Sequence, residues 1–314
     1  MKPPRCATPL AACLVAALAG CDGAPSTIER AMRENMTVLA ERDPTSALGW
    51  NDWLARHDAT LLLDPDPPDI EVLDLSGPFD ATAYAAPILP ARRRPDARHR
   101  HPIMSAPPDH VPASDLPTRR EYVDAPHRRP TPLGWVDNGL DAYLAEVNGS
   151  VALRFPDGEL ACLDWVRTNE RPYTSLGRRL IEEGHAPADG MTLEVIRSLH
   201  QSSPSLVESL MLDNDRVVYF RRIEPDRWPQ ASTGAVLVPG RSVAVDPDVI
   251  PLGSVVVVER ADGERLVATA VDIGGAIVDR RIDLFLGSGP AAVVEAGGLV
   301  EPVRVRVLRP ALRP

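Results

Sequence analysis

Cysteine is scarce in this chain, and its distribution excludes several kinds of site. The sequence has 4 cysteines, and three of them, Cys6, Cys13 and Cys21, lie in or directly after an apolar N-terminal stretch. Only Cys162 remains, so the body of the chain cannot form an intramolecular disulfide. Its neighbours lack the spacing of metal ligands, and no zinc motif occurs elsewhere in the sequence. We therefore expect Cys162 to be a small core residue, and we expect no metal and no other cofactor.

Excess positive charge and long apolar runs are also lacking. The formal net charge is -10, from 34 Lys and Arg residues against 44 Asp and Glu residues, which argues against nucleic acid as a partner. After residue 20 no segment is long and apolar enough to cross a membrane as a helix. The length of 314 residues suffices for two modest domains or one elaborated domain.

The N-terminus has the pattern of an export signal. Lys2 and Arg5 form a short basic region, Leu10 to Ala19 is an apolar core, and Leu18-Ala19-Gly20-Cys21 has the small residues of a cleavage site that ends in cysteine. This pattern predicts a lipoprotein signal peptide over residues 1–20 and a lipid on Cys21, which would tether a soluble body to a membrane of the bacterial cell envelope. A secreted protein with a chance cysteine is the alternative.

Residues 21–74 are predicted to be a spacer with helical elements. Ser26 or Thr27 suits the cap of a helix that runs to about Glu41, and Ala47 to Leu63 suits a second helix. A run rich in Pro and Asp, 64–69, would end it. We expect this segment to hold the body away from the membrane or to brace it.

Three aspartates, Asp246, Asp272 and Asp283, stand out because each lies in or at the end of a run of β-branched and aliphatic residues. Short runs of this kind, bounded by Gly, Pro and Asp, predict buried strands joined by tight turns. Burial disfavours the charged form of a carboxyl group and raises its pKa, so such an acid either has a partner or stays protonated for chemistry. Asp283 is flanked by Ile282 and Leu284, and it is the first candidate for a catalytic acid.

The segments around these aspartates carry a family resemblance. The sequences PGRSVAVDPDVIPLG (239–253), VDIGGAI (271–277) and IDLFLG (282–287) resemble the three-aspartate signature of the MltA-type membrane-bound lytic transglycosylases. Members of that family cleave peptidoglycan and are built on a double-psi β-barrel. Because the three-aspartate module also occurs in other cell-wall proteins, these segments alone predict the fold better than the reaction.

The resemblance extends to a domain that the family inserts into its barrel. PYTSLGRRLIEEG (172–184) and VVYFR (217–221) are similar to motifs of that domain, and the likeness runs from about residue 79 to residue 308 in the family's order. It implies a mainly β fold, with a double-psi β-barrel over residues 75–90 and 231–314 and an inserted α+β domain over 91–230. Barrel strands are expected around Phe79 to Ile88 and over Val236–Val238, Val243–Asp246, Ser254–Glu259, Leu266–Asp272, Arg281–Leu286 and Val303–Leu308. Closure into a barrel removes the exposed edges of these short apolar strands.

Local patterns predict the elements of the inserted region. Val151–Phe155 and Leu160–Val166 flank a Pro-Asp-Gly turn and suit a hairpin. Leu140–Val147 suits a short helix or strand, and a helix ended by Gly184 follows Ser175. Further elements are a helix capped by Thr192 and a strand over 213–222, and the family resemblance implies a helix that starts at Pro117-Thr118-Arg119.

The resemblance implies a reaction that needs only one carboxyl group. In the family an aspartic acid protonates the glycosidic oxygen of the β-1,4 bond between MurNAc and GlcNAc. The same group, now a base, takes the proton of the MurNAc C6 hydroxyl as a 1,6-anhydro ring closes. The matching residue here is Asp283, and Asp272 is expected to support it. The apolar neighbours of Asp283 would raise its pKa by desolvation, as an acid that works near neutral pH requires.

Sugar binding is expected in a groove between the barrel and the inserted domain. By motif position the candidate residues are Tyr84, Asn148, Gly149, Ser150, Tyr173, Ser175, Asp246 and Gly275. Each also has a core or turn explanation, and for Asp246, which precedes Pro247, a turn-capping role is as reasonable as a role in the site. The basic run 92–101 is either a solvated loop or a patch that attracts the carboxylates of peptidoglycan stem peptides.

Two departures from the family pattern leave alternatives open. Asn148-Gly149-Ser150-Val151 stands where the family has Gln-Gly-Ser-Gly, which shortens a hydrogen-bonding arm and adds bulk. Val278 and Asp279 follow the Gly-Gly-Ala-Ile run, where the family has Lys. A catalytically weakened peptidoglycan-binding lipoprotein on the same fold is therefore the main alternative, and a hydrolase of another polysaccharide is the third hypothesis.

The expected partners follow from these assignments. They are peptidoglycan glycan strands and, through the lipidated Cys21, a membrane, with cell-wall synthesis enzymes as further candidates. The protein is expected to be a periplasm-facing monomer. The family's usual location is the outer membrane, whereas Asp22 resembles the signal that retains lipoproteins in the inner membrane.

Overall fold

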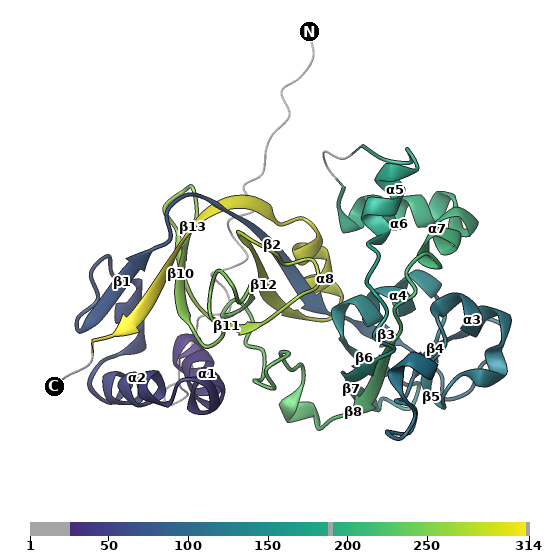
Figure 1. The fold of residues 1–314 in the computed structure, drawn as a ribbon, viewed down its shortest axis with the longest axis horizontal. Coiled ribbons are helices and arrows are strands. Elements are labelled where there is room, and N and C mark those ends of the chain that lie inside the picture. The colour runs from purple at the N-terminus through teal and green to yellow at the C-terminus, as the bar shows by residue number, and fades with distance from the viewer. Residues whose placement is uncertain (1–25, 188–190, 312–314) are drawn as a thin grey trace, which may run out of the picture.

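The computed structural model describes residues 26–187 and 191–311. The predicted signal peptide, the lipid site at Cys21 and Asp22 lie outside these residues. Figure 1 shows a barrel on the left and a second unit, built on a smaller sheet, on the right. Within the described ranges, no helix has both the length and the apolar character needed to cross a membrane.

The larger sheet closes into a barrel. Among the described residues its strands are β1 (Ile70–Asp74), β2 (Phe79–Ala86), β9 (Ser242–Ala244), β10 (Val255–Glu259), β11 (Arg265–Asp272), β12 (Arg281–Ser288) and β13 (Val300–Pro310), in the order β1-β13-β10-β11-β9-β12-β2. Because β2 also pairs with β13, all of these strands except β1 form a closed ring. The parallel pairing of β12 with β2 places Asp283 opposite Thr82.

The run of four valines in β10 is buried on both of its faces. Val256 and Val258 belong to the cluster inside the barrel, whereas Val255 and Val257 belong to a cluster between the barrel and two helices. Side chains alternate across a strand, so an unbroken apolar run is expected only where both faces are covered.

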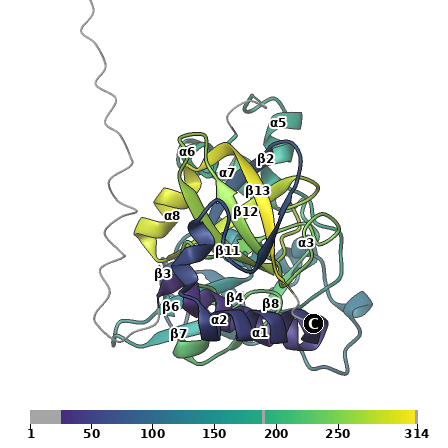
Figure 2. The ribbon, with the colours of Figure 1, turned by 90° about the vertical axis from the view of Figure 1, so that its left-hand side faces the viewer.

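The covering helices are α1 (Thr27–Arg42) and α2 (Pro44–Arg56), followed by the 3-10 helix η3 (Ala59–Leu63), and they lie along one side of the barrel in Figures 1 and 2. Ser26 caps α1 by accepting a hydrogen bond from the backbone N–H of Glu29. Asn35 Nδ2 donates to the carbonyl of Gly253 at 2.7 Å. The N-terminal segment thus packs against the barrel and braces it. The strand that follows these helices, β1, pairs with β13 of the barrel sheet.

The second unit is a four-stranded sheet surrounded by short helices. Among the described residues its strands run in the order β3 (Ile88–Pro90), β6 (Ser150–Arg154), β7 (Leu160–Thr168) and β8 (Val218–Arg222), and β4 (His101–Met104) pairs separately with β5 (Pro132–Val136). Its helices are α3 (Arg119–Asp124), α4 (Gly139–Asn148), α5 (Leu176–Glu182), α6 (Leu193–Ser202) and α7 (Pro204–Met211), with 3-10 helices η4 (Ala113–Asp115), η5 (Pro126–Arg128) and η6 (Pro225–Arg227). The last helix, α8 (Pro290–Gly297), packs on β2 and β12 of the barrel.

Most local predictions are confirmed, and the exceptions have physical causes. The hairpin of β6 and β7 has the predicted pairing, Leu140–Val147 is helical, and Thr118 and Thr192 cap α3 and α6. The strand predicted at Val236–Val238 is wrong, since only an isolated bridge to Gln230 occurs there. Ile88 pairs in the second sheet rather than in the barrel. The predicted second N-terminal helix starts at Pro44 and ends at Arg56, because His57 is extended.

Candidate active site

A cleft of about 320 Å³ lies between the barrel and the second unit. Its barrel side includes Tyr84, Asp272, Asp283 and the loop Ile273–Ile277. Its other side comes from the end of α4, from β7 and from the loops around residues 173 and 214–216. Of the residues predicted from the sequence, the cleft brings together Tyr84, Asn148, Gly149, Tyr173, Asp272, Gly275 and Asp283.

Asp283 lies in β12, where β2 and β9 flank it. Its Oδ1 accepts a hydrogen bond from Thr82 Oγ1 at 2.7 Å. Burial raises the pKa of Asp283 to about 6, against the opposing effects of the Thr82 hydrogen bond and the charge of Arg281, while the charge of Asp272 adds to the increase. A carboxyl with this pKa holds its proton in an appreciable fraction of molecules near neutral pH, so it can donate that proton to a substrate.

Asp272, at the end of β11, is held by three donors. Its Oδ2 accepts from the Tyr84 hydroxyl at 2.7 Å, and its Oδ1 accepts from the backbone N–H groups of Ser232 at 2.7 Å and Ile273 at 2.9 Å. Burial and the neighbouring Asp272 raise the pKa of Tyr84 well above its usual value, so the phenol stays a neutral donor. The Tyr84 ring packs against Phe285, with ring centroids 5.3 Å apart. Asp272 is therefore fixed beside Asp283 with both oxygens engaged.

Asp246 does not line the cleft within the described residues. Its Oδ1 accepts from the N–H of Asp248 at 3.0 Å, which closes the turn after β9, and its Oδ2 accepts from the N–H of Asp279 at 2.6 Å. Asp279 has a φ of 54°, a left-handed conformation that a residue other than glycine adopts at some cost. The turn-capping interpretation of Asp246 thus has direct geometric support.

Ser150 and Ser175 also lie away from the cleft lining. The hydroxyl of Ser150 is buried and is 3.5 Å from the carbonyl oxygen of Leu163, and the hydroxyl of Ser175 caps α5 by accepting from the N–H of Arg178 at 3.3 Å. Both serines have local structural roles in the described chain.

The altered family motif does not add bulk to the cleft. Gly149 ends α4 with a φ of 72°, and Asn148 Nδ2 donates to the carbonyl of Ala85 in β2 at 3.3 Å. Val151 points into the core of the second unit, so its side chain does not reach the cleft. Val278 and Asp279 do not line the cleft either.

Two features of the cleft were missed from the sequence. Trp165 in β7 is 40% exposed and lines the cleft next to Gly149. An aromatic side chain left exposed in a cleft offers a flat apolar face to a sugar ring. The residue could have been found as an aromatic at an outward position of a strand, but that assignment needs the strand register.

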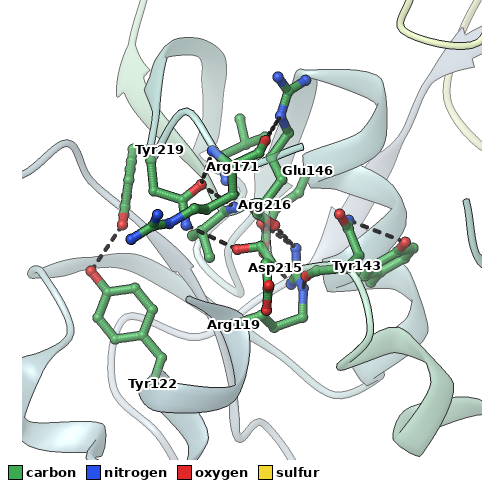
Figure 3. Close-up of polar contacts among 12 residues, drawn as sticks. Arg119, Tyr122, Tyr143, Glu146, Arg171, Asp215, Arg216 and Tyr219 are labelled. Carbon is green, nitrogen blue, oxygen red and sulfur yellow. Dashed lines mark hydrogen bonds and ion pairs between the residues drawn. The ribbon is translucent and has the colours of Figure 1, made fainter. Parts of the chain in front are cut away.

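The second missed feature is a largely buried ion pair between Arg119 and Glu146, which both line the cleft (Figure 3). The guanidinium donates to both carboxylate oxygens, at 3.1 and 2.9 Å, and also to the carbonyls of Asn214 and Arg216. Glu146 Oε2 accepts in addition from the N–H of Val218 at 3.0 Å. Bidentate pairing with further hydrogen bonds makes a rigid network, which positions the 214–216 loop against the cleft.

Within the described chain, no group of three or more His, Cys, Asp or Glu residues is arranged to hold a metal ion. Cys162 is buried, and burial raises the pKa of its thiol.

Family models match most of the chain. The MltA specific insert domain matches residues 80–221, and the 3D domain matches residues 241–309. The membrane-bound lytic murein transglycosylase A of Vibrio cholerae serotype O1 is 30% identical over 237 residues, which are 71% of this chain and 63% of that protein. The protein of the same name from Escherichia coli K12 is 29% identical over 256 residues, 77% of this chain and 68% of that protein. The match to the Vibrio protein thus spans slightly less than two thirds of its length.

Solved structures have the same fold. Escherichia coli MltA with bound chitohexaose is similar with a TM-score of 0.76 at 23% identity, over 90% of this chain and 89% of that chain. The lytic transglycosylase LtgG of Burkholderia pseudomallei is similar with a TM-score of 0.58 at 27% identity, over 92% of this chain and 90% of that chain. These likenesses and the closed ring of strands confirm the predicted double-psi β-barrel with an inserted α+β domain. With both family models matched in the order that the resemblance predicted, the chain belongs to the family of proteins that combine an MltA specific insert domain with a 3D domain.

Proposed function

We propose that this protein is a peptidoglycan lytic transglycosylase that cleaves the β-1,4 bond between MurNAc and GlcNAc and leaves 1,6-anhydroMurNAc ends. One observation carries the proposal: a carboxyl group, Asp283, lines a cleft of about 320 Å³, and burial raises its pKa to about 6. The relatives named lytic murein transglycosylase and a solved neighbour with bound chitohexaose support a glycan as the substrate.

The proposed reaction uses Asp283 twice. Its carboxylic acid donates a proton to the glycosidic oxygen as the bond from that oxygen to MurNAc C1 breaks, which releases the GlcNAc side as an alcohol and leaves an oxocarbenium-like MurNAc. The resulting carboxylate then accepts the proton of the C6 hydroxyl as its oxygen bonds to C1. The protonated carboxyl is restored, and no water is consumed.

Asp272 serves as a positioning residue in this scheme. All three of its hydrogen bonds come from protein donors, so it is poorly placed to attack the sugar, while its charge helps to keep the proton on Asp283. Tyr84, Asn148, Gly149, Tyr173 and Gly275 are the proposed sugar contacts, joined by Trp165. For Ser150, Ser175 and Asp246 we propose supporting roles through the backbone segments that they hold.

The alternative, a binding protein without turnover, is not favoured. That alternative is based on the altered Gln-Gly-Ser-Gly motif and the missing Lys. The residues that replace the family's residues, Val151, Val278 and Asp279, do not line the cleft and so do not block it. The groups that the single-carboxyl mechanism needs are present together.

We also propose that Cys21 carries a lipid that anchors the protein in the cell envelope, in the outer membrane by family resemblance, with Asp22 leaving the inner membrane as the other site. Fractionation of cells should find the wild-type protein with membranes and the Cys21→Ser variant in the soluble fraction. Equal partitioning of the two would refute the anchor.

We propose that the barrel domain comprises residues 75–90 and 231–314 and that the inserted domain comprises residues 91–230. The barrel sheet also includes β1, which precedes residue 75.

Mass spectrometry of peptidoglycan digested with the full-chain protein in detergent tests the reaction. Wild-type protein should release anhydromuropeptides, and Asp283→Asn should release them about 100 to 10,000 times more slowly, as expected for loss of a general acid. Asp109→Asn is the matched control, because Asp109 is exposed and is not part of the cleft lining. Reducing ends in place of anhydro ends, or full activity of Asp283→Asn, would refute the proposal.

A further inference from the structure

A second cavity, of about 270 Å³, lies beside the cleft and shares Tyr84, Asn148 and Asp283 with it. It extends from Asp283 between β2, the end of α8 with the start of β13, and the helices α4 and α6. A ligand that occupies the cleft up to Asp283 can therefore continue into this cavity without a break.

The second cavity has an unpaired positive charge at its catalytic end. Arg281 precedes Asp283 by two positions in β12, and alternate residues of a strand share a face. Within the part of the chain that the structure describes, its guanidinium has no hydrogen bond or ion pair. The other cation in the lining, Arg197, is paired with Asp141 at 2.7 Å. The cavity thus presents one available cation beside an acid that holds its proton part of the time.

The neighbouring Arg280 is engaged elsewhere. Its guanidinium lies over the Phe79 ring, 4.6 Å from the centroid, and donates to the carbonyls of Ser76 and Pro78. It does not line either cavity. Arg281 therefore lines the second cavity, whereas the adjacent Arg280 does not. Substitution of Arg280 is thus a matched control for substitution of Arg281.

Part of the second cavity is aliphatic, and its lining also includes Thr82, Thr192 and the paired Asp141 and Arg197. The apolar lining comprises Val293, Ala296, Leu299 and Val300 from α8 to the start of β13, Leu193 from the start of α6, and Met191, which precedes α6. The first cleft has two aromatic side chains, Trp165 and Tyr173, which suit a sugar, and the second cavity has neither of them. Aliphatic walls with a cation at one end suit a short peptide that has methyl side chains and a carboxylate.

We propose that the second cavity binds the acidic stem peptide carried by the substrate's muramoyl residue, with Arg281 pairing with a peptide carboxylate. This inference rests on the proposed function, because the stem peptide is attached to the sugar whose glycosidic bond Asp283 would cleave. The lactyl ether that carries the peptide lies on the same ring as the reacting C1, so a peptide leaving that ring passes close to Asp283. Arg281 then acts as a specificity residue for peptide-bearing strands.

The test compares glycan strands that carry stem peptides with strands from which an amidase has removed them. The full-chain protein should show a higher kcat/KM on the peptide-bearing strands. Arg281→Gln should reduce the ratio of the two kcat/KM values about tenfold, as expected for the loss of one charge-assisted hydrogen bond, and Arg280→Gln should keep the wild-type ratio. The ratio matters because Arg281 also acts on the pKa of Asp283, which changes both rates together.

Two results would overturn the inference. One is a wild-type protein with no preference for peptide-bearing strands, and the other is an Arg281→Gln variant that loses activity equally on both substrates, because its ratio of the two kcat/KM values would then equal that of wild type. Titration calorimetry of both strand types with Asp283→Asn, with and without Arg281→Gln, repeats the comparison without turnover. If wild-type protein forms no anhydro ends, the proposed function fails, and this binding ratio still decides the role of Arg281.

Discussion

The acidity of Asp283 results from opposing effects of its nearest neighbours. Burial raises its pKa to about 6, although Thr82 and Arg281 favour the carboxylate. An acid catalyst must be protonated, so the proposed activity falls as pH rises through this pKa. The neighbours therefore determine the upper limit of the working pH range.

Replacing Thr82 with Val tests this balance. The change removes the 2.7 Å hydrogen bond to Oδ1 and fills similar volume, so the pKa of Asp283 should rise and the alkaline limb of the kcat/KM profile should move by about one pH unit to higher pH. Thr82→Ser keeps the hydroxyl and should keep the wild-type limb. An unshifted limb in Thr82→Val would mean that Asp283 is not the titrating acid.

Asp164, in β7, is a second buried carboxyl and is 4% exposed. Its Oδ1 has no hydrogen-bond partner within the described residues. Burial raises its pKa to about 7, Arg221 opposes the increase, and the charge of Asp272 adds to it. Because the folded pKa lies above the unfolded value, stability from this group is complete below about pH 4 and is lost as pH rises to about 7.

Asp164→Asn, which cannot ionise, should therefore gain stability over wild type as pH rises. We expect a relative gain of about 3 kcal/mol between pH 4 and pH 8, measured as the difference between the free energies of unfolding of the two proteins at each pH. Asp109→Asn, at an exposed site, should show no such trend. A difference that stays constant with pH would mean that Asp164 is ionised in the folded protein.

At the residue scale, the sequence predicts the environment of a side chain only where that environment is determined by residues nearby in the chain. The partial burial of Asp283 is predictable from Ile282 and Leu284, which point to a covered strand. The exposure of Trp165 and the pairing of Arg119 with Glu146 are not predictable in this way, because both depend on contacts between segments that are distant in the sequence.

At the scale of elements, α1 and α2 act as part of the barrel. Their apolar residues and the outward valines of β10 bury one another, and Trp53 is fully buried and donates from Nε1 to the carbonyl of Pro68 at 2.8 Å. The N-terminal helices are thus expected to contribute to the stability of the catalytic strands.

Trp53→Ala should lower the free energy of unfolding by about 3 to 5 kcal/mol, the usual cost of removing a large buried aromatic side chain. Leu48→Ala in the same helix should cost less than about 0.5 kcal/mol, because Leu48 is 71% exposed. Thermal unfolding of both variants and of the wild type measures these two losses of stability. Equal effects would mean that the helices do not pack on the barrel as described.

Elements with strong periodicity or caps were predictable from the sequence, and elements that depend on tertiary pairing were not. α1 has a capping serine and a repeating apolar face, and it was predicted within a residue at its C-terminus. The strand expected at 213–222 begins only at Val218, because the side chain of Asn214 accepts from the N–H of Thr174 and its carbonyl accepts from Arg119.

At the scale of the whole molecule, the cleft depends on strand pairs between distant parts of the chain. β2 is the segment that pairs with β12 and β13, and it supplies both Thr82 and Tyr84 to the two aspartates. The chain then leaves the barrel for the second unit and returns after β8, which sets the opposite wall. Family resemblance predicted this arrangement, whereas local periodicity could not, because it carries no information on which distant strands pair.

The most direct test of the central claim is digestion of peptidoglycan in water labelled with heavy oxygen, followed by mass spectrometry of the new glycan ends. If Asp283 acts as acid and then base on the C6 hydroxyl, the ends will be 1,6-anhydro sugars without label. If the ends are reducing sugars that carry heavy oxygen, water is the attacking group, and the single-carboxyl transglycosylase mechanism is contradicted.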